Sequence, residues 1–219
     1  MLSRTIKLRA MTSNHYHPSR QAFTLIEVLL VVLIIGALLG ITAPAIQGAV
    51  MASRLRDSAA AISSELFEAQ QLAIFLGTET EVRFYQLPDP MVASAAPLLR
   101  KVQVFSLGQP PTGPGAGPNQ GGVFLAAGPA QSLDSSLVIS PSTAFSSIAN
   151  LGFQTDNSDR QGRFVAFRFH ADGSTDLAPQ KEWFLTVLER KAGGIPVRPV
   201  NFVTLQIDPA SGRVRSFQP

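Results

Sequence analysis

The sequence contains no cysteine and only three histidines, and these absences exclude much of the usual chemistry of catalytic and exported proteins. Without cysteine there is no disulfide, no thiolate nucleophile and no lipidated-cysteine anchor. Two of the histidines lie within residues 1–22, which leaves His170 as the single imidazole base farther along the chain. No serine lies in a nucleophile elbow, and the glycines of residues 113–122 lack the Lys-Ser/Thr of a phosphate loop. The sequence therefore predicts neither an enzyme nor a cofactor.

Charge is also missing from parts of the N-terminal region. Residues 1–22 contain four basic and no acidic side chains, and residues 28–41 contain no charged or polar side chain. From Phe23 onward the chain has 14 basic and 15 acidic residues, so its net charge there is near −1. The basic pI of about 9.7 comes largely from the first segment. This distribution is typical of the cytoplasmic flank of a membrane helix and makes nucleic acid an unfavoured partner.

Residues 23–46 form one apolar stretch. As a helix with a rise of about 1.5 Å per residue, it reaches on the order of 36 Å, against about 30 Å for the core of a bilayer. We therefore expect residues 23–46 to be a transmembrane helix preceded by the basic segment 1–22. Met11 is an alternative start that would keep Arg20 in that segment.

Residues 47–77 continue as an amphipathic helix. Apolar residues recur with alternating spacings of four and three, which predicts one buried stripe. The stripe consists of Leu55, Ala59, Ile62, Leu66, Ala69, Ala73 and Leu76. Gly77 is a candidate C-cap because glycine enters the left-handed conformation at little cost. We expect a single long helix from about Phe23 to Leu76.

Residues 78–219 are expected to form a β-rich head. Short alternating or aromatic-rich runs predict strands. These runs are 80–87, 101–107, 123–126, 137–140, 163–170, 182–191, 200–207 and 213–217. Residues 108–122 are low in complexity and are expected to form a mobile loop. Short connections imply antiparallel pairing, so the predicted class is α+β, with a long N-terminal helix packed on an antiparallel sheet.

The junction between the basic and apolar segments carries the most specific pattern. Residues 21–28 (QAFTLIEV), followed by Gly36 and Pro44, resemble the cleavage and methylation motif of type IV pilins and type II secretion pseudopilins. The resemblance implies cleavage between Ala22 and Phe23 by a prepilin peptidase, with 1–22 as leader, and N-methylation of Phe23. The family usually has glycine where this chain has Ala22, the next smallest residue.

A weaker resemblance extends into the head. Residues 54–59, 69–74, 81–84, 203–207 and 212–215 look like the H-type minor pseudopilin and FimT-like group, and the whole resembles Verru_Chthon cassette protein D. It implies a minor structural subunit of a type IV pilus-like or type II secretion-type fibre. The implied partners are other pilin subunits and inner-membrane lipid. The implied location is the bacterial inner membrane, single-pass, with the N-terminus cytoplasmic and the head periplasmic.

Glu27 is a functional candidate on physical grounds as well. A carboxylate placed in a bilayer costs a few kcal/mol, so such residues are normally functional. Cleavage before Phe23 creates an α-amine four residues away, and in a stack of parallel helices the amine of one subunit can pair with Glu27 of another. Gly36 and Gly40 form a small-xxx-small pattern that permits close helix approach. Pro44 frees the carbonyl of Gly40, which predicts either a static kink or loosening during assembly.

Several alternatives remain open. Residues 43–45 (Ala-Pro-Ala) resemble a signal peptidase site, and an uncleaved signal anchor is also possible. His170, Asp172 and Asp176 suggest a metal site, although an Asp-Gly turn also explains them. The aromatic residues of the C-terminal third suggest either a ligand platform or, preferably, core packing: Trp183, Phe164, Phe167, Phe169, Phe184 and Phe202.

The arginines near the C-terminus give the alternative function. Arg213 and Arg215 are two apart on an expected strand, so they project from one face, and Arg190, Lys191 and Arg198 could join them. Such a patch could hold a phosphate backbone, as in a DNA-binding minor pilin, but it also suits a solvated sheet edge. A membrane-anchored periplasmic binding domain unrelated to pili is the third function class.

Overall fold

The computed structural model describes residues 23–89, 92, 96–108, 122–156, 162–190 and 200–219, without the side chains of 41–47. The chain divides into two units, Met1–Ile46 and Gln47–Pro219, each treated by itself below. The expected leader 1–22, most of the expected loop 108–122 and the expected turn 192–194 lie outside the described residues.

Helix α1 runs from Leu25 to Leu76 without interruption, as the sequence predicts. At its C-terminal end Gly77 has φ +63°, and the amide of Thr78 donates to the carbonyl of Ala73 at 3.3 Å. This is the six-to-one bond of a Schellman motif, which glycine permits because it has no Cβ. The expected C-cap is thus confirmed.

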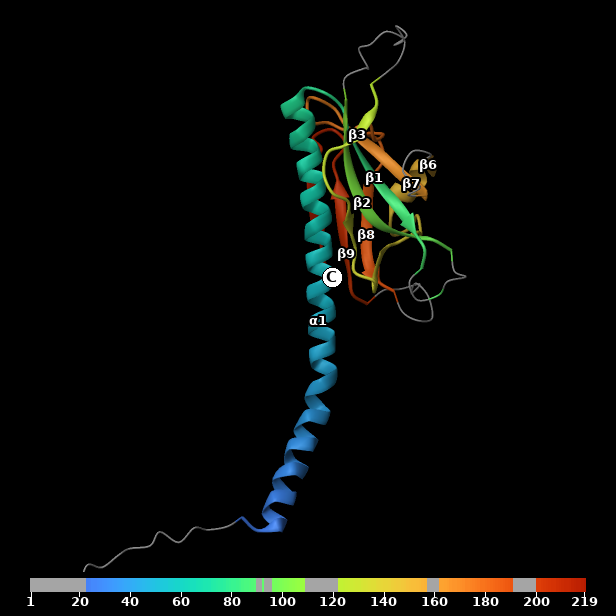
Figure 1. Ribbon diagram of the computed structural model, residues 1–219. Helices are drawn as coiled ribbons and strands as arrows, with labels where there is room; N and C mark the ends of the chain where they lie inside the picture. Colours follow the sequence, from blue (N-terminus) through green and yellow to red (C-terminus); the bar gives the residue numbers. More distant parts are fainter. Residues whose placement is uncertain (1–22, 90–91, 93–95, 109–121, 157–161, 191–199) are drawn as a thin grey trace, which may run out of the picture. The chain divides into compact units, whose positions relative to one another are not determined.

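The second half of α1 buries one stripe against the sheet (Figure 1). The stripe residues from Leu55 to Ala73 are at most 2% exposed, and they pack in the same cluster as the sheet core. The prediction that Leu76 is the last buried member of the stripe is wrong, because Leu76 is 45% exposed in the final turn. Burial of this stripe holds the helix on the sheet, since each fully buried large aliphatic side chain contributes about 1.5–3 kcal/mol.

Within the described residues the strands form one antiparallel sheet of ten strands. They are β1 Thr80–Leu87, β2 Leu98–Leu107, β3 Phe124–Ala126, β4 Gln131–Ser132, β5 Leu137–Ile139, β6 Gln154–Asp156, β7 Gly162–Phe169, β8 Trp183–Glu189, β9 Phe202–Ile207 and β10 Val214–Phe217. The order is β10-β9-β8-β5-β2-β1-β7-β6, with β3 and β4 also paired to β2. Strands β1 and β7 lie side by side although about 80 residues separate them (Figure 1).

Three short elements were not predicted from the sequence. Strands β4 and β6 and the 3-10 helix η1, Ser147–Leu151, have no clear alternation of polar and apolar residues. The other strands were predicted, most of them within one or two residues at each end, and β2 begins three residues earlier than expected. Non-local pairing of β5 with β8 and of β7 with β1 fixes the topology, and no local pattern contains that information.

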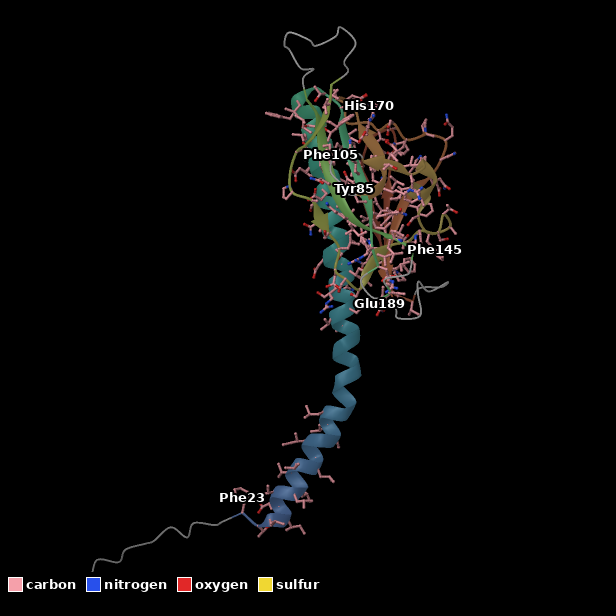
Figure 2. The ribbon with its side chains drawn as sticks, turned by 45° about the vertical axis from the view of Figure 1, so that its right-hand side comes forward. Phe23, Tyr85, Phe105, Phe145, His170 and Glu189 are labelled. Atoms are coloured by element: carbon pink, nitrogen blue, oxygen red, sulfur yellow. The ribbon has the colours of Figure 1, made fainter. Side chains whose placement is uncertain are left out.

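The two faces of the sheet bury different residue types. The face toward α1 is aliphatic and aromatic, including Phe84, Phe167 and Leu205. On the opposite face of β1, β2 and β7 a smaller cluster contains Tyr85, Phe105 and Phe164. Figure 2 labels Tyr85 and Phe105 on this part of the head. Side chains alternate across a strand, so the two clusters are separated by the sheet itself. Four of the expected aromatic residues are buried in these clusters, namely Trp183, Phe164, Phe167 and Phe169, whereas Phe184 and Phe202 are partly exposed.

Charged side chains complete the second face. The guanidinium of Arg83 lies over the rings of Phe105 at 4.0 Å and Phe164 at 4.8 Å, and its Nε donates to Glu81 Oε1 at 2.6 Å. Arg168 Nε donates to the other oxygen of Glu81 at 3.0 Å. The buried Glu81 carboxylate is therefore compensated by two arginines, which is the condition for keeping a charge out of water.

The sequence analysis expects a transmembrane helix over residues 23–46. Within the part of the chain that the structure describes, no helix combines the length and the hydropathy needed to cross a bilayer.

One buried ion pair links loops at the end of the sheet. Arg190, directly after β8, pairs through Nη2 with Asp89, two residues after the end of β1. Their side chains are 4% and 2% exposed. Breaking a buried pair leaves an uncompensated charge, which costs about 3–5 kcal/mol. We expect Arg190→Met to lower the free energy of unfolding by that amount in urea titrations. The exposed pair of Arg54 with Asp134, at 3.7 Å, is the control: Arg54→Met should cost about 0–1 kcal/mol. Equal effects of the two changes would contradict the prediction.

Candidate functional site

The start of α1 has the geometry of a capped helix. Thr24 precedes the helix, and its Oγ1 accepts a hydrogen bond from the amide of Glu27 at 3.3 Å. Its carbonyl accepts from the amides of Glu27 and Val28 at 3.1 and 3.2 Å. Threonine at the N-cap with glutamate three residues later is the pattern of a capping box. The sequence analysis overlooked Thr24, although the T-x-x-E spacing is visible in residues 24–27.

Glu27 is the one acidic residue in the first turn of α1. A carboxylate here lies near the positive end of the helix dipole, where an acidic side chain stabilises a helix. Phe23, which would carry the new α-amine after cleavage, directly precedes the N-cap Thr24 and is 77% exposed; Figure 2 shows it at the beginning of the α1 ribbon. Since a helix rises about 1.5 Å per residue, Phe23 and Glu27 are about one turn apart along the axis. Ala22 lies outside the described residues.

The first part of α1 is apolar on all sides. Every residue from Leu25 to Gly40 is exposed in the single chain, and Glu27 is the only charged residue among them. Leu25 and Ile26 are 83% and 75% exposed. A helix that is hydrophobic all round requires burial by lipid or by other helices.

The glycines of this segment leave space on the helix surface. A Cβ built at Gly36 or at Gly40 would have no other atom within 4 Å. In the single chain, then, these glycines are not required by packing. The α1 backbone stays helical through Pro44, whose side chain lies outside the described part, so loosening at this position remains a prediction.

The residues considered for a metal site form a turn. Asp172 Oδ1 accepts from the amide of Ser174 at 2.9 Å and from its hydroxyl at 2.6 Å, while Gly173 has φ +83°. Asp176 Oδ1 accepts from the amide of Arg168 at 2.8 Å. His170 Nδ1 lies 3.5 Å from Glu79 Oε1. Among the described residues no three His, Asp or Glu side chains are placed to hold a metal ion.

The candidate phosphate patch is smaller than expected. Arg213 and Arg215 are both exposed, with Arg213 directly before β10 and Arg215 on it. Arg190 does not join them, because it is buried with Asp89 at the end of β8 that is remote from β10. Lys191 and Arg198 lie outside the described residues. The inclusion of Arg190 in this patch was wrong, because no local pattern around Arg190 indicates its buried partner.

The comparisons with known proteins agree with the N-terminal pattern. Residues 17–43 match the family model described as the prokaryotic N-terminal methylation motif, which confirms the resemblance indicated by residues 21–28. No curated protein matches the chain. One similar solved structure is the minor pseudopilin EpsH from the Type 2 Secretion System of Vibrio cholerae. It is 14% identical, with a TM-score of 0.42 over 76% of this chain and 98% of that chain.

Two aspartates of the His170 turn should respond oppositely to pH. Burial raises the pKa of Asp176, so its ionised form destabilises the fold, and this effect disappears below the unfolded pKa of about 3.9. Asp176→Asn keeps the acceptor for Arg168 and should raise Tm at pH 7 but not at pH values well below 3.9. Hydrogen bonds from Ser174 lower the pKa of Asp172, so Asp172→Asn should lower Tm at pH 7 and converge with the parent in acid. Thermal unfolding followed by circular dichroism at both pH values tests this, and shifts of equal sign would contradict it.

Proposed function

We propose that the chain is a prepilin-like structural subunit, a pseudopilin, and not an enzyme. In this proposal a prepilin peptidase cuts between Ala22 and Phe23, Phe23 is N-methylated, and α1 assembles with other subunits in a type IV pilus-like or type II secretion-type fibre. The observation that carries it is the match of residues 17–43 to the methylation motif at the start of an exposed helix whose first part is apolar apart from Glu27. The subunit is proposed to be a minor component.

The ion pair supplies a physical reason for fibre growth. Each processed chain offers one α-amine at Phe23 and one carboxylate at Glu27. If the amine of one subunit binds Glu27 of the next, each subunit uses two different surfaces. Such heterologous contacts produce an open helical filament when the rotation between subunits does not close into a ring. Within lipid or a helix bundle neither charge is hydrated, so each cancels the desolvation cost of the other. A shift of one residue separates the charges, which fixes the axial register.

The exposed surface of α1 fits the same role. Lipid of the inner membrane would cover Leu25–Gly40 before assembly, and neighbouring helices would cover it afterwards. Gly36 and Gly40, where a Cβ would meet nothing in the single chain, would then be places where another helix comes close. Location in the inner membrane, with the head in the periplasm, follows from the motif and the basic residues before Phe23, and it is part of the proposal.

Processing is tested by the intact mass of the full-length protein extracted from membranes of its native host. We expect a chain that starts at Phe23 and is heavier by one methyl group. Replacing Ala22 with the glycine usual in the family should leave the product unchanged, because both residues are small. A chain that begins at Ile46 would show signal peptidase cleavage and contradict the proposal.

Assembly is tested by Glu27→Gln, which keeps the shape of the side chain and removes its charge. Cleavage should continue, because the scissile bond is untouched, while the amount of subunit in fibres sheared from cells should fall more than about tenfold, equivalent to about 1.4 kcal/mol. Glu68→Gln, on an exposed face of the second half of α1, is the matched control and should assemble normally. Normal assembly of Glu27→Gln would reject the ion-pair role, even with correct processing.

A further inference from the structure

Strand β10 is an open edge of the sheet. It pairs with β9, and among the described residues no strand lies on its other side. Asp208 donates its amide to the carbonyl of Arg213 at 2.9 Å, which identifies Arg213 as a residue whose polar backbone groups face β9. In an antiparallel pair such residues alternate with residues that face away. The amide and carbonyl groups of Val214 and Ser216 therefore point to the open side.

A groove of about 520 Å³ lies beside this edge, between β10 and the second half of α1. The helix wall contains Phe67 and Ile74, which are 61% and 47% exposed. The strand wall contains Arg213, Val214 and Arg215. This volume falls in the range of pockets that accept small ligands or short peptide segments. Exposed aromatic and aliphatic side chains beside an unpaired strand edge favour the binding of another polypeptide segment.

The walls of the groove are held in place by hydrogen bonds between helix and sheet. Gln70 Nε2 donates to the carbonyls of Ser211, at 2.7 Å, and Gly173, at 2.8 Å. Gly212 has φ +65°, and a Cβ there would lie 2.2 Å from the carbonyl oxygen of Gly173. At the other end of β10, Arg56 Nε donates to Gln218 Oε1 at 3.2 Å. Because the walls are fixed, a ligand would not have to order them on binding.

The charge of the groove selects its occupant. Among the described residues, its lining contains two arginines and no acidic residue. Asp208, which interacts with Arg215, lines a separate hollow that also borders these arginines and contains Lys181 and Glu182. A strand placed beside β10 would direct alternate side chains to opposite faces. One set would meet Phe67 and Ile74, and the other would meet Arg213 and Arg215.

We infer that this groove binds an extended acidic segment of a partner protein, which pairs with β10 as an additional antiparallel or parallel strand. The segment would alternate apolar and acidic residues. Main-chain hydrogen bonds to Val214 and Ser216 would supply affinity, and the two walls would supply selectivity, as in other cases of strand addition. This inference goes beyond the proposed function and does not require processing at Phe23, because the groove lies wholly in Gln47–Pro219.

The test uses the full-length chain in neutral detergent and a fluorescent peptide of alternating glutamate and valine. We expect saturable binding by fluorescence anisotropy that weakens with salt, and no binding of the matched lysine and valine peptide. In the unmodified protein, the peptide should slow hydrogen exchange at the amides of Val214 and Ser216. Exchange at Arg215 should not change, because its amide already faces β9.

Two substitutions separate the contributions. Ser216→Pro removes an outward amide and should weaken peptide binding at least tenfold, whereas Ser216→Ala retains that amide and should not change it. Phe67→Ser, on an exposed helix face, should weaken binding without lowering Tm. Since Ser216→Pro could disturb β10 itself, hydrogen exchange in the unmodified protein decides independently.

The following outcomes would overturn the inference. They are absence of binding up to about 1 mM peptide, binding without slower exchange at Val214 and Ser216, and equal binding of the lysine and valine peptide. Binding of a thymidine oligonucleotide in preference to the acidic peptide, lost in Arg213→Ala/Arg215→Ala, would identify a nucleic-acid surface in its place.

Discussion

The structure depends on one constraint: the apolar surface of α1 must be buried, and its own chain buries only part of it. From Leu55 to Ala73 the helix presents a single stripe, and the sheet covers it completely. From Leu25 to Gly40 the apolar surface surrounds the helix, and every residue is exposed in the isolated chain. A sheet can cover one stripe of a helix but not its whole circumference. The first segment therefore requires an environment outside the chain, whether lipid or other helices.

The buried charges follow one rule, although they occur in different settings. Glu81 is held between two arginines, and Asp89 is held by Arg190. In each case a charge that cannot reach water has a partner of opposite sign within the same chain. Glu27 has no such partner among the described residues, and its segment needs burial. The proposed α-amine of a neighbouring subunit would extend the same rule across an interface.

The sequence was sufficient where local chemistry decides structure. The spacing from Leu55 to Ala73 predicted the buried stripe, and Gly77 predicted the end of α1, because helix periodicity and the left-handed cap depend on neighbouring residues. The motif around Phe23 was visible for the same reason. The sequence did not reveal that Arg190 is buried, because its partner Asp89 is about 100 residues away. It also gave no sign of the groove, which depends on where the chain places β10 beside Phe67 and Ile74.

The contents of the groove distinguish a peptide from a nucleic acid. Binding of single-stranded nucleic acid depends on the number of phosphates neutralised, and two arginines would neutralise about two. The net charge near −1 after Phe23 adds no general attraction for a polyanion. An extended peptide contacts the same two arginines and also makes contacts that a phosphate backbone cannot make. It pairs with the open edge at Val214 and Ser216, and it buries apolar side chains against Phe67 and Ile74. The backbone pairing satisfies polar groups on the open edge, and the apolar contacts cover exposed hydrophobic side chains. An acidic strand therefore contacts more of the groove than a polyanion does.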